Sequence, residues 1–362
     1  MMKCHVLILI CLIHCNCLLA QVSNFEKEAQ TLLQEAIEEN QTIGIAAGFS
    51  TNGELLWQDA KGLRDAEKSI PFSPSTKTRI ASITKPMTAI AILQLYERGQ
   101  LHLDTPIQTY LTSFPTKKEG NITIRQLLQH TAGIGGYKNV REQENTSYYA
   151  TIEEAVNIFK DRPLVSTPGQ QFNYSTYGYV ILGLILEKIS GMSYQTYMQA
   201  NIWDKCEMNN TGVEDSKHQV LEKSRVYHKN SKGKIVAAEQ TDLSDRIPGG
   251  GVYSTVEDLL KFGDAVISNE LIKESTFSEM ISNPNLKAEG NGYGMGWYLY
   301  GENPNYGNVI GHNGSQTGAS TFLMLLPEVK TTIIVLSNTS GAMQAISTIT
   351  VKLFDIAHNA RK

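Results

Sequence analysis

The two ends of the chain carry matching strand patterns, and this feature limits the possible folds more than any other. Near the N-terminus, "IGIAAGFS" and "ELLWQDAKG" flank Asn52-Gly53, a pair that tolerates the positive φ angles of a tight two-residue turn. Near the C-terminus, residues 319–326 ("ASTFLMLL") and 331–338 ("TTIIVLSN") flank the turn sequence "PEVK". Strands at both ends of one chain predict a single antiparallel sheet.

A helix is predicted beside each pair of strands. In the first helix the apolar residues recur at helical spacing with glutamates between them: Phe25, Ala29, Leu32, Leu33, Ala36 and Ile37. A last helix is predicted from about Gly341, with these apolar positions: Met343, Ile346, Ile349, Val351, Leu353 and Ile356. The predicted fold class is therefore α+β, an antiparallel sheet flanked by helices.

The middle of the chain differs from both ends. "TIRQLLQH", "TIEEAVNIFK" and "YGYVILGLILEKISG" are helical patterns separated by loops that contain Gly and Pro. We therefore predict one domain of two lobes, a sheet lobe (21–104 and 249–362) and a mostly helical inserted lobe (105–248). A cleft between two such lobes is a usual place for a functional site.

The first twenty residues resemble a secretory signal peptide. Lys3 precedes the short apolar run "VLILICLI", and a cleavage site is expected near Ala20. The alternatives are an uncleaved anchor and a lipid-modified Cys15 or Cys17. The signal-peptide pattern leads us to expect an exported protein, periplasmic or secreted. No later segment of the sequence is long and apolar enough to span a bilayer.

Composition excludes several functions. The formal net charge of −4 on 362 residues provides no basic field, so no nucleic-acid partner is expected. After removal of residues 1–20 only Cys206 remains, so no internal disulfide can form, and an isolated thiol is preferred over a nucleophile. No cluster has metal-ligand spacing, so no metal site is predicted. The sequence carries no signal for the oligomeric state.

The stretch "ASITKPMTAIAI" (81–92) provides the main candidate site. A long apolar helix begins close to Ser82, and Lys85 lies almost one turn later on the same face. A serine hydroxyl needs a base to become a nucleophile, and a lysine in an apolar setting loses some preference for its charged form. Backbone N–H groups at a helix start can also stabilise a developing oxyanion.

The pattern Ser-x-x-Lys is weak by itself. Ser82 could cap the helix while Lys85 extends to water. The same spacing recurs at Ser231 and Lys234, in a polar stretch typical of an exposed turn. Other residues of the chain must therefore show which of the two Ser-x-x-Lys pairs belongs to a catalytic site.

Two later segments supply companions to Ser82 and Lys85. Tyr174 lies on a loop directly before an apolar helix, where it could pass a proton to a leaving group. "GHNGSQTG" (311–318) lies just before the strand at 319 and offers His312 and a glycine-rich backbone that can approach a substrate.

Ser82-Ile-Thr-Lys85, Tyr174-Ser-Thr176 and His312-Asn-Gly314 occur in the order and approximate spacing of three motifs. With them the chain resembles the class C β-lactamase-like serine hydrolases, which include penicillin-binding D,D-peptidases and esterases. "GQLHLDTPIQTYL", "ITIRQLLQHTAGI" and "GGGVYSTVEDLLKF" also resemble family segments, so the resemblance covers nearly all of the chain after residue 20.

The resemblance implies roles for these residues. Ser82 would be the acylated nucleophile, and Lys85 and Tyr174 would share the general base and acid work. The substrate-binding positions would be His312, Thr176 and Gly314. The backbone N–H groups of Ser82 and Ser315 would form the oxyanion hole, without metal or cofactor. The expected substrate is a short peptide, a D-amino-acid peptide, a small ester or a β-lactam, cleaved at an amide or ester bond.

Two positions depart from the family pattern. Thr176 replaces the usual Asn, with fewer donors and shorter reach, and His312 replaces a lysine. Both departures disfavour efficient β-lactamase action. The alternative function is a non-hydrolytic penicillin-binding-like sensor or a self-assembling scaffold.

Three other features are interpreted as structural. Ser254 and Thr255 precede acidic residues as in a helix cap, His130 is interpreted as a loop anchor, and 249–251 ("GGG") as a tight bend at the cleft.

Overall fold

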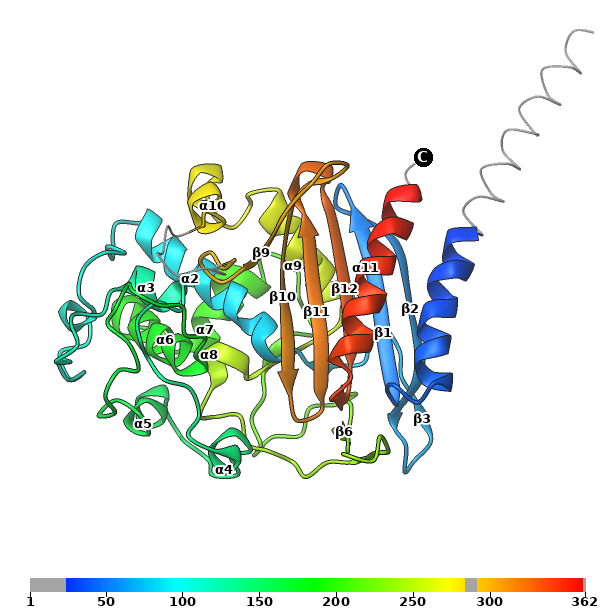
Figure 1. Cartoon of the computed structure of the whole chain (residues 1–362), viewed down its shortest axis with the longest axis horizontal. Coiled ribbons are helices and arrows are strands. Elements are labelled where there is room, and N and C mark those ends of the chain that lie inside the picture. The colour runs from blue at the N-terminus through cyan, green and yellow to red at the C-terminus, as the bar shows by residue number, and fades with distance from the viewer. Residues whose placement is uncertain (1–23, 284–291, 361–362) are drawn as a thin grey trace, which may run out of the picture.

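The computed structural model describes residues 24–283 and 292–360, and its largest element is a seven-stranded sheet. The strand order is β3-β2-β1-β12-β11-β10-β9, so the strands from the two ends of the chain lie side by side (Figure 1). The single antiparallel sheet predicted from the sequence is confirmed. Its strands are β1 (Gly44–Thr51), β2 (Glu54–Asp65), β3 (Ile70–Pro71), β9 (Tyr298–Asn303), β10 (Gly307–Gln316), β11 (Ala319–Leu326) and β12 (Thr331–Ser337).

Local turn chemistry sets the register of these strands. Asn52 and Gly53 have φ angles of 53° and 76°, as a tight hairpin between β1 and β2 requires. The 3-10 turn η4 (Pro327–Val329) joins β11 to β12. β1 then pairs with β12 in antiparallel fashion, with Ile45 opposite Ser337.

Helices cover both faces of the sheet. Residues 24–38 are helical, and α11 (Met343–Asn359) lies on the same face. α9 (Val256–Ile267) packs on the other face against β1, β11 and β12. Every residue of these three strands is buried, because both faces are covered.

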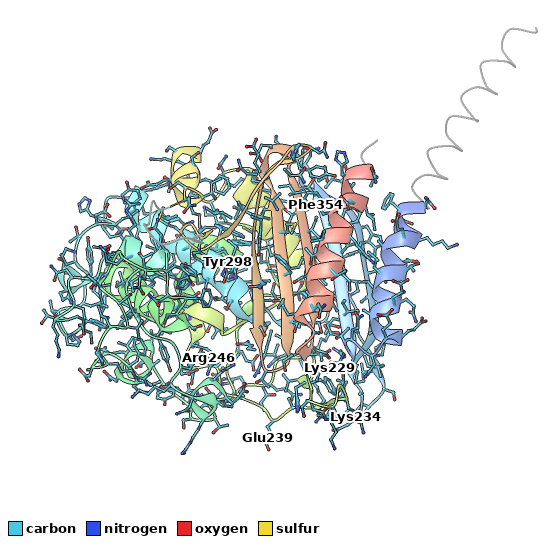
Figure 2. All side chains as sticks on the ribbon, viewed as in Figure 1. Lys229, Lys234, Glu239, Arg246, Tyr298 and Phe354 are labelled. Carbon is cyan, nitrogen blue, oxygen red and sulfur yellow. The ribbon has the colours of Figure 1, made fainter. Side chains whose placement is uncertain are left out.

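One predicted core position on the last helix is wrong. Val351 is 54% exposed, although it was assigned to the apolar face of α11. Ile349, two residues earlier, is buried. Two residues turn a helix by about 200°, so Val351 projects away from the face that Ile349 and Leu353 bury. Phe354, labelled in Figure 2, completes the buried stripe.

The remaining helices form a second body beside the sheet (Figure 1). α2 (Thr84–Glu97), which the sequence analysis placed with the sheet lobe, packs against α6, α7 and α8. The predicted lobe boundary at 248/249 falls inside α8. The other helices of this body are η2 (Ile107–Thr109), α3 (Ile124–Leu128), α4 (Val140–Gln143), α5 (Ile152–Asn157), α6 (Thr176–Ser190), α7 (Tyr194–Met198), η3 (Gln199–Trp203), α8 (Ile247–Gly250) and α10 (Glu274–Met280).

Two small sheets complete the described fold. One has the order β4-β8-β5 and the other β13-β6-β7. Their strands are β4 (Thr78–Arg79), β5 (Gly212–Val213), β6 (Tyr227–Lys229), β7 (Ile235–Ala237), β8 (Val252–Ser254) and β13 (Thr339–Ser340). Ser231 and Lys234 lie exposed in the turn between β6 and β7, as predicted for an exposed turn.

The signal peptide predicted for residues 1–20 lies outside the described residues. Within the part that is described, none of the helices combines the length and the apolar character needed to cross a bilayer.

Candidate active site

Ser82 and Lys85 lie where the chain passes from a strand into a buried helix. β4 is followed by the 3-10 helix η1 (Ala81–Ile83) and then by α2. Pro86 is tolerated because it occupies the first turn, where an N–H has no intrahelical partner. Lys85 Nζ lies 3.0 Å from Ser82 Oγ, so the structure brings the predicted pair together.

Lys85 is fully buried and is held by neutral oxygen atoms. Its Nζ lies 2.7 Å from the carbonyl oxygen of Gly249 and 3.4 Å from Thr176 Oγ1. No carboxylate of the described residues forms an ion pair with it. Burial holds the pKa of Lys85 well below its ordinary value, and the charge of Arg246 lowers that pKa further. A neutral amine can direct two N–H groups to Gly249 and Thr176 and its lone pair to Ser82.

The backbone of Gly249 can reach Lys85 only because residue 249 is a glycine. A Cβ at this position would lie 2.7 Å from Thr176 Cγ2, which is closer than real contacts allow. The sequence predicts a bend at the cleft for 249–251, but not this carbonyl contact. The glycine triplet is the feature of the sequence that could have indicated this contact.

Tyr174 ends the loop before α6, and its ring covers Lys85. The ring centroid lies 4.9 Å from Lys85 Nζ, and the side chain is 36% exposed. Burial raises the pKa of Tyr174 well above its ordinary value, and a hydrogen bond with Ser82 opposes that rise. The phenol therefore stays protonated at neutral pH and can act as a proton donor.

His130 fixes the loop that carries Tyr174. The backbone N–H of Ser175 donates to His130 Nδ1 at 3.2 Å, and the N–H of Asn173 donates to the carbonyl oxygen of His130 at 2.7 Å. The rings of His130 and Tyr174 lie 4.3 Å apart. These contacts agree with the interpretation of His130 as a loop anchor.

His312 lies on strand β10, whereas the sequence analysis placed it in a segment preceding a strand. It is fully buried, and its Nδ1 lies 2.6 Å from the carbonyl oxygen of Asn313. Because a carbonyl oxygen only accepts, Nδ1 carries the proton, and Nε2 accepts from the Tyr293 hydroxyl at 3.0 Å. Burial lowers the pKa of His312 to about 3. His312 thus contributes no positive charge at neutral pH.

Around His312 the site is bordered by packed rings, which we call the aromatic wall: His130, Phe172, Tyr174, Tyr293, Tyr298 and His312. Tyr298 on β9 lies parallel to Tyr174 with ring centroids 6.3 Å apart. Figure 2 shows Tyr298 and Arg246 between the sheet and the helical body. Neither histidine of the wall is charged at neutral pH, since burial also holds the pKa of His130 well below its ordinary value.

Ser82 also borders a small cavity of about 50 Å³ that is partly open to solvent. We call it the polar cavity. Its lining residues are Ser82, Tyr137, Gln143, Glu144, Thr176, Thr241, Leu243, Arg246, Gly249, Gly250, Ser315, Gln316 and Thr317. The predicted site residues Thr176 and Ser315 therefore lie at the same cavity as Ser82. The sequence analysis missed Glu144 and Arg246, because their loops carry no readable motif.

Gly314 lets β10 approach the segment that carries Ser82. A Cβ at residue 314 would lie 2.4 Å from the carbonyl oxygen of Ile80, so no other residue type fits without displacing that backbone. Ser315, the next residue of β10, is exposed at the polar cavity. This close approach places the backbone of Ser315 next to the start of α2.

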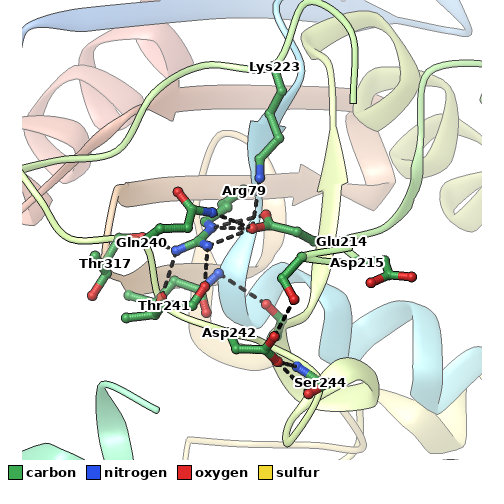
Figure 3. A network of polar contacts seen from close by, with 12 residues as sticks. Arg79, Glu214, Asp215, Lys223, Gln240, Thr241, Asp242, Ser244 and Thr317 are labelled. Carbon is green, nitrogen blue, oxygen red and sulfur yellow. Dashed lines mark hydrogen bonds and ion pairs between the residues drawn. The ribbon is translucent and has the colours of Figure 1, made fainter. Parts of the chain in front are cut away.

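A buried ionic network lies behind the polar cavity (Figure 3). Arg79 on β4 binds Glu214 through Nε and Nη2, with a shortest distance of 2.6 Å. Its Nη1 donates to Thr241 Oγ1 at 2.9 Å and to the carbonyl oxygen of Thr317 at 2.8 Å. Lys223 adds a second ion pair to Glu214 at 2.7 Å. The network ties the strand before Ser82 to the end of β10.

Two further predictions concern residues outside the site. Thr255 caps α9 by accepting a hydrogen bond from the N–H of Asp258 at 3.4 Å. Cys206 is a buried free thiol, and burial raises its pKa to about 12, so it is a poor nucleophile. Within residues 24–283 and 292–360, no group of three or more His, Cys, Asp or Glu side chains is placed to hold a metal ion.

Comparison with known proteins agrees with this geometry. The chain is 30% identical to the human "Serine beta-lactamase-like protein LACTB, mitochondrial", covering 83% of this chain and 72% of the relative. It is also 30% identical to "Penicillin-binding protein 4*" of Bacillus subtilis, over 87% and 72% of the two chains. An octameric penicillin-binding protein homologue from Pyrococcus abyssi has a TM-score of 0.80 at 26% identity, over 92% and 77% of the chains. Residues 29–353 match the Beta-lactamase family, and the chain therefore belongs to that family.

Proposed function

We propose that the protein is a serine hydrolase that cleaves an amide or ester bond through an acyl-enzyme on Ser82. The observation that carries this proposal is the position of Lys85 Nζ, 3.0 Å from Ser82 Oγ in a buried site without a carboxylate partner. A lysine without a counter-charge, buried among neutral oxygen atoms, is suited to act as a base at neutral pH.

In the proposed acylation step, Lys85 accepts the Ser82 proton as Oγ bonds to the substrate carbonyl carbon. The carbonyl oxygen becomes negatively charged and is stabilised by the backbone N–H groups of Ser82 and Ser315. Tyr174 donates its proton to the leaving amine or alcohol when the scissile bond breaks, and Lys85 returns a proton to Tyr174. Water then attacks the acyl-enzyme, and Ser82 is regenerated with release of the acid.

The free edge of β10 favours a substrate with an extended, peptide-like backbone. β9 pairs with β10 only up to Gly311, opposite Tyr298. The following residues of β10, 312–316, therefore present backbone groups on that side to which an extended chain could hydrogen-bond. Among the described residues, the polar cavity and β10 offer no uncompensated cation to a substrate carboxylate, which disfavours β-lactams.

A covalent probe tests the nucleophile. A fluorophosphonate reporter should label the wild-type protein and fail to label Ser82→Ala. Ser231→Ala, which removes the serine of the exposed Ser-x-x-Lys, should be labelled like the wild type. Thermal melting checks that both proteins are folded. Equal labelling of Ser82→Ala and the wild type would then contradict the proposal.

The non-hydrolytic alternative is separated by turnover. If the probe labels Ser82 but no ester, dipeptide or lactam of a substrate panel is hydrolysed, the protein is a penicillin-binding-like sensor or scaffold.

We also propose that residues 1–20 direct export. N-terminal sequencing should then show that the mature protein begins near Gln21.

A further inference from the structure

We propose that Glu144 is a specificity-determining residue that binds the protonated amino group of the substrate. The preferred substrates would be amides or esters of amino acids and peptides in which a free amino group lies next to the acyl carbon. This inference rests on the proposed function and names the substrate class for the same site.

Glu144 reaches the polar cavity from the loop that follows α4. It is half-buried and lines the same cavity as Ser82. One carboxylate oxygen, Oε2, accepts a hydrogen bond from Thr317 Oγ1. Across the described residues, Oε1 has no hydrogen-bond partner, and no cation forms an ion pair with Glu144. One oxygen is therefore positioned by the protein and the other remains available.

Arg246, the basic residue that lines this cavity, is paired with an acid behind it. Arg246 binds Asp245 through two hydrogen bonds, Nε to Oδ1 at 2.7 Å and Nη2 to Oδ2 at 3.0 Å. Tyr137 covers the guanidinium face at 4.6 Å from the ring centroid. The Nη1 group of Arg246 can still donate to a neutral acceptor such as a substrate carbonyl, while Asp245 supplies the counter-charge of the guanidinium.

The ionic network behind the cavity offers no free donor to a substrate. The five N–H groups of Arg79 all point at protein acceptors, namely Glu214, the hydroxyl and carbonyl oxygens of Thr241, and the carbonyl oxygen of Thr317 (Figure 3). Glu214 also binds Lys223. Asp242 is satisfied by the hydroxyl groups of Ser216 and Ser244 and adds a further negative charge to this side.

Glu144 is therefore the single uncompensated charge among the described residues that line the polar cavity. An ammonium group carries one positive charge and up to three N–H donors, which match a carboxylate oxygen without a partner. An N-acylated amine in this position would leave Glu144 without a counter-charge, and a substrate carboxylate would face a like charge.

Two matched substrates test the inference. The methyl ester of phenylalanine, with a free amine, and the methyl ester of N-acetylphenylalanine differ only at the amino group, and both enantiomers of each should be assayed at pH 7. Glu144→Gln should lower kcat/KM for the free amine about 10- to 100-fold, the range expected for a charge-assisted hydrogen bond. It should change kcat/KM for the N-acetyl ester by less than about threefold.

The same change of charge away from the site provides the control. Glu153 on α5 is paired with Lys188 at an exposed position. Glu153→Gln should leave kcat/KM for both esters unchanged. The preference of the wild type for the free amine should also fall as pH rises above about 8, where a free α-amino group loses its proton.

The outcomes separate this inference from the proposed function. An equal loss on both esters would show that Glu144 only holds Thr317, and a wild-type preference for the N-acetyl ester would also overturn the inference. Fluorophosphonate labelling of Ser82 in either case would leave the hydrolase assignment intact. As a second measurement, phenylalanine amide should slow labelling of the wild type more than labelling of Glu144→Gln, and equal slowing counts against the inference.

Discussion

The aromatic wall and the polar cavity both border Ser82, but they handle charge in opposite ways. In the wall, His312 is neutral because it is buried and both ring nitrogens are occupied by Asn313 and Tyr293. At the cavity, Arg246 is paired with Asp245, and Glu144 is the one charged lining residue in the described part of the chain that lacks a counter-charge. The difference shows that one site can combine an uncharged border with a charged one through burial on one side and pairing on the other.

Lys85 depends on both borders at once. Neither provides it with a carboxylate partner, since the wall contributes the ring of Tyr174 and the cavity contributes the oxygen atoms of Gly249 and Thr176. The positive charge of Arg246 adds to the effect of burial and lowers the pKa of Lys85. Moving any acid next to Lys85 would raise that pKa and remove the base.

The largest loss of activity is expected on substitution of Lys85, which contacts both the aromatic wall and the polar cavity. Lys85→Ala removes the base and should lower kcat about 100- to 10,000-fold. It also leaves the buried carbonyl oxygen of Gly249 without this donor, so some loss of thermal stability is expected. Ester hydrolysis and thermal melting measure the two quantities. Activity close to that of the wild type would assign Lys85 a structural role only.

The next effect concerns stability on the cavity side. Arg79→Met leaves Glu214 with only Lys223 as a charged partner in a buried setting, and should lower the free energy of unfolding by about 3–5 kcal/mol. Urea denaturation measures it. Lys188→Met provides the contrast, because Lys188 pairs with Glu153 at an exposed position and its loss should cost about 1 kcal/mol or less. Equal costs would mean that the buried network is no more important than a surface pair.

The smallest effect is expected for a substitution in the aromatic wall, and it is measured as the pH dependence of kcat/KM. The base must be deprotonated, and the pKa of Lys85 is lowered, so activity should rise with pH as Lys85 loses its proton and fall as pH drops through that pKa. His312, with a pKa of about 3, does not titrate between about pH 5 and 8. His312→Gln should therefore change the rate but not the apparent pKa of the kcat/KM profile. A shift of one unit would show that His312 carries charge in this range.

The sequence predicted those parts of the fold that depend on local patterns. The β1–β2 hairpin follows from Asn52-Gly53, and β11 from its continuous apolar run. β10 was missed because "GNVIGHNGSQ" is rich in Gly and Asn, residues depleted in strands. It becomes a strand because β11 pairs with it along residues 310–316, which is a long-range effect that composition does not reveal.

The site residues were also predictable only where a local sequence pattern or a family motif marks them. Ser82 and Lys85 lie within one helical turn, so their proximity follows from sequence spacing. Tyr174 and His312 were found through their resemblance to family motifs. Glu144 and Arg246 could not be found, because their roles depend on the meeting of loops about a hundred residues apart, where neither propensity nor periodicity carries a signal.

Arg79 has a consequence for motion. Its hydrogen bonds to Thr241 and Thr317 fasten the strand before the nucleophile to the end of β10, so the two backbone segments expected to hold the oxyanion form one rigid unit. Any opening or closing over a substrate would then leave this unit in place. A lysine could not replace Arg79, since three donors on one nitrogen cannot span acceptors that five N–H groups in a planar fork reach together.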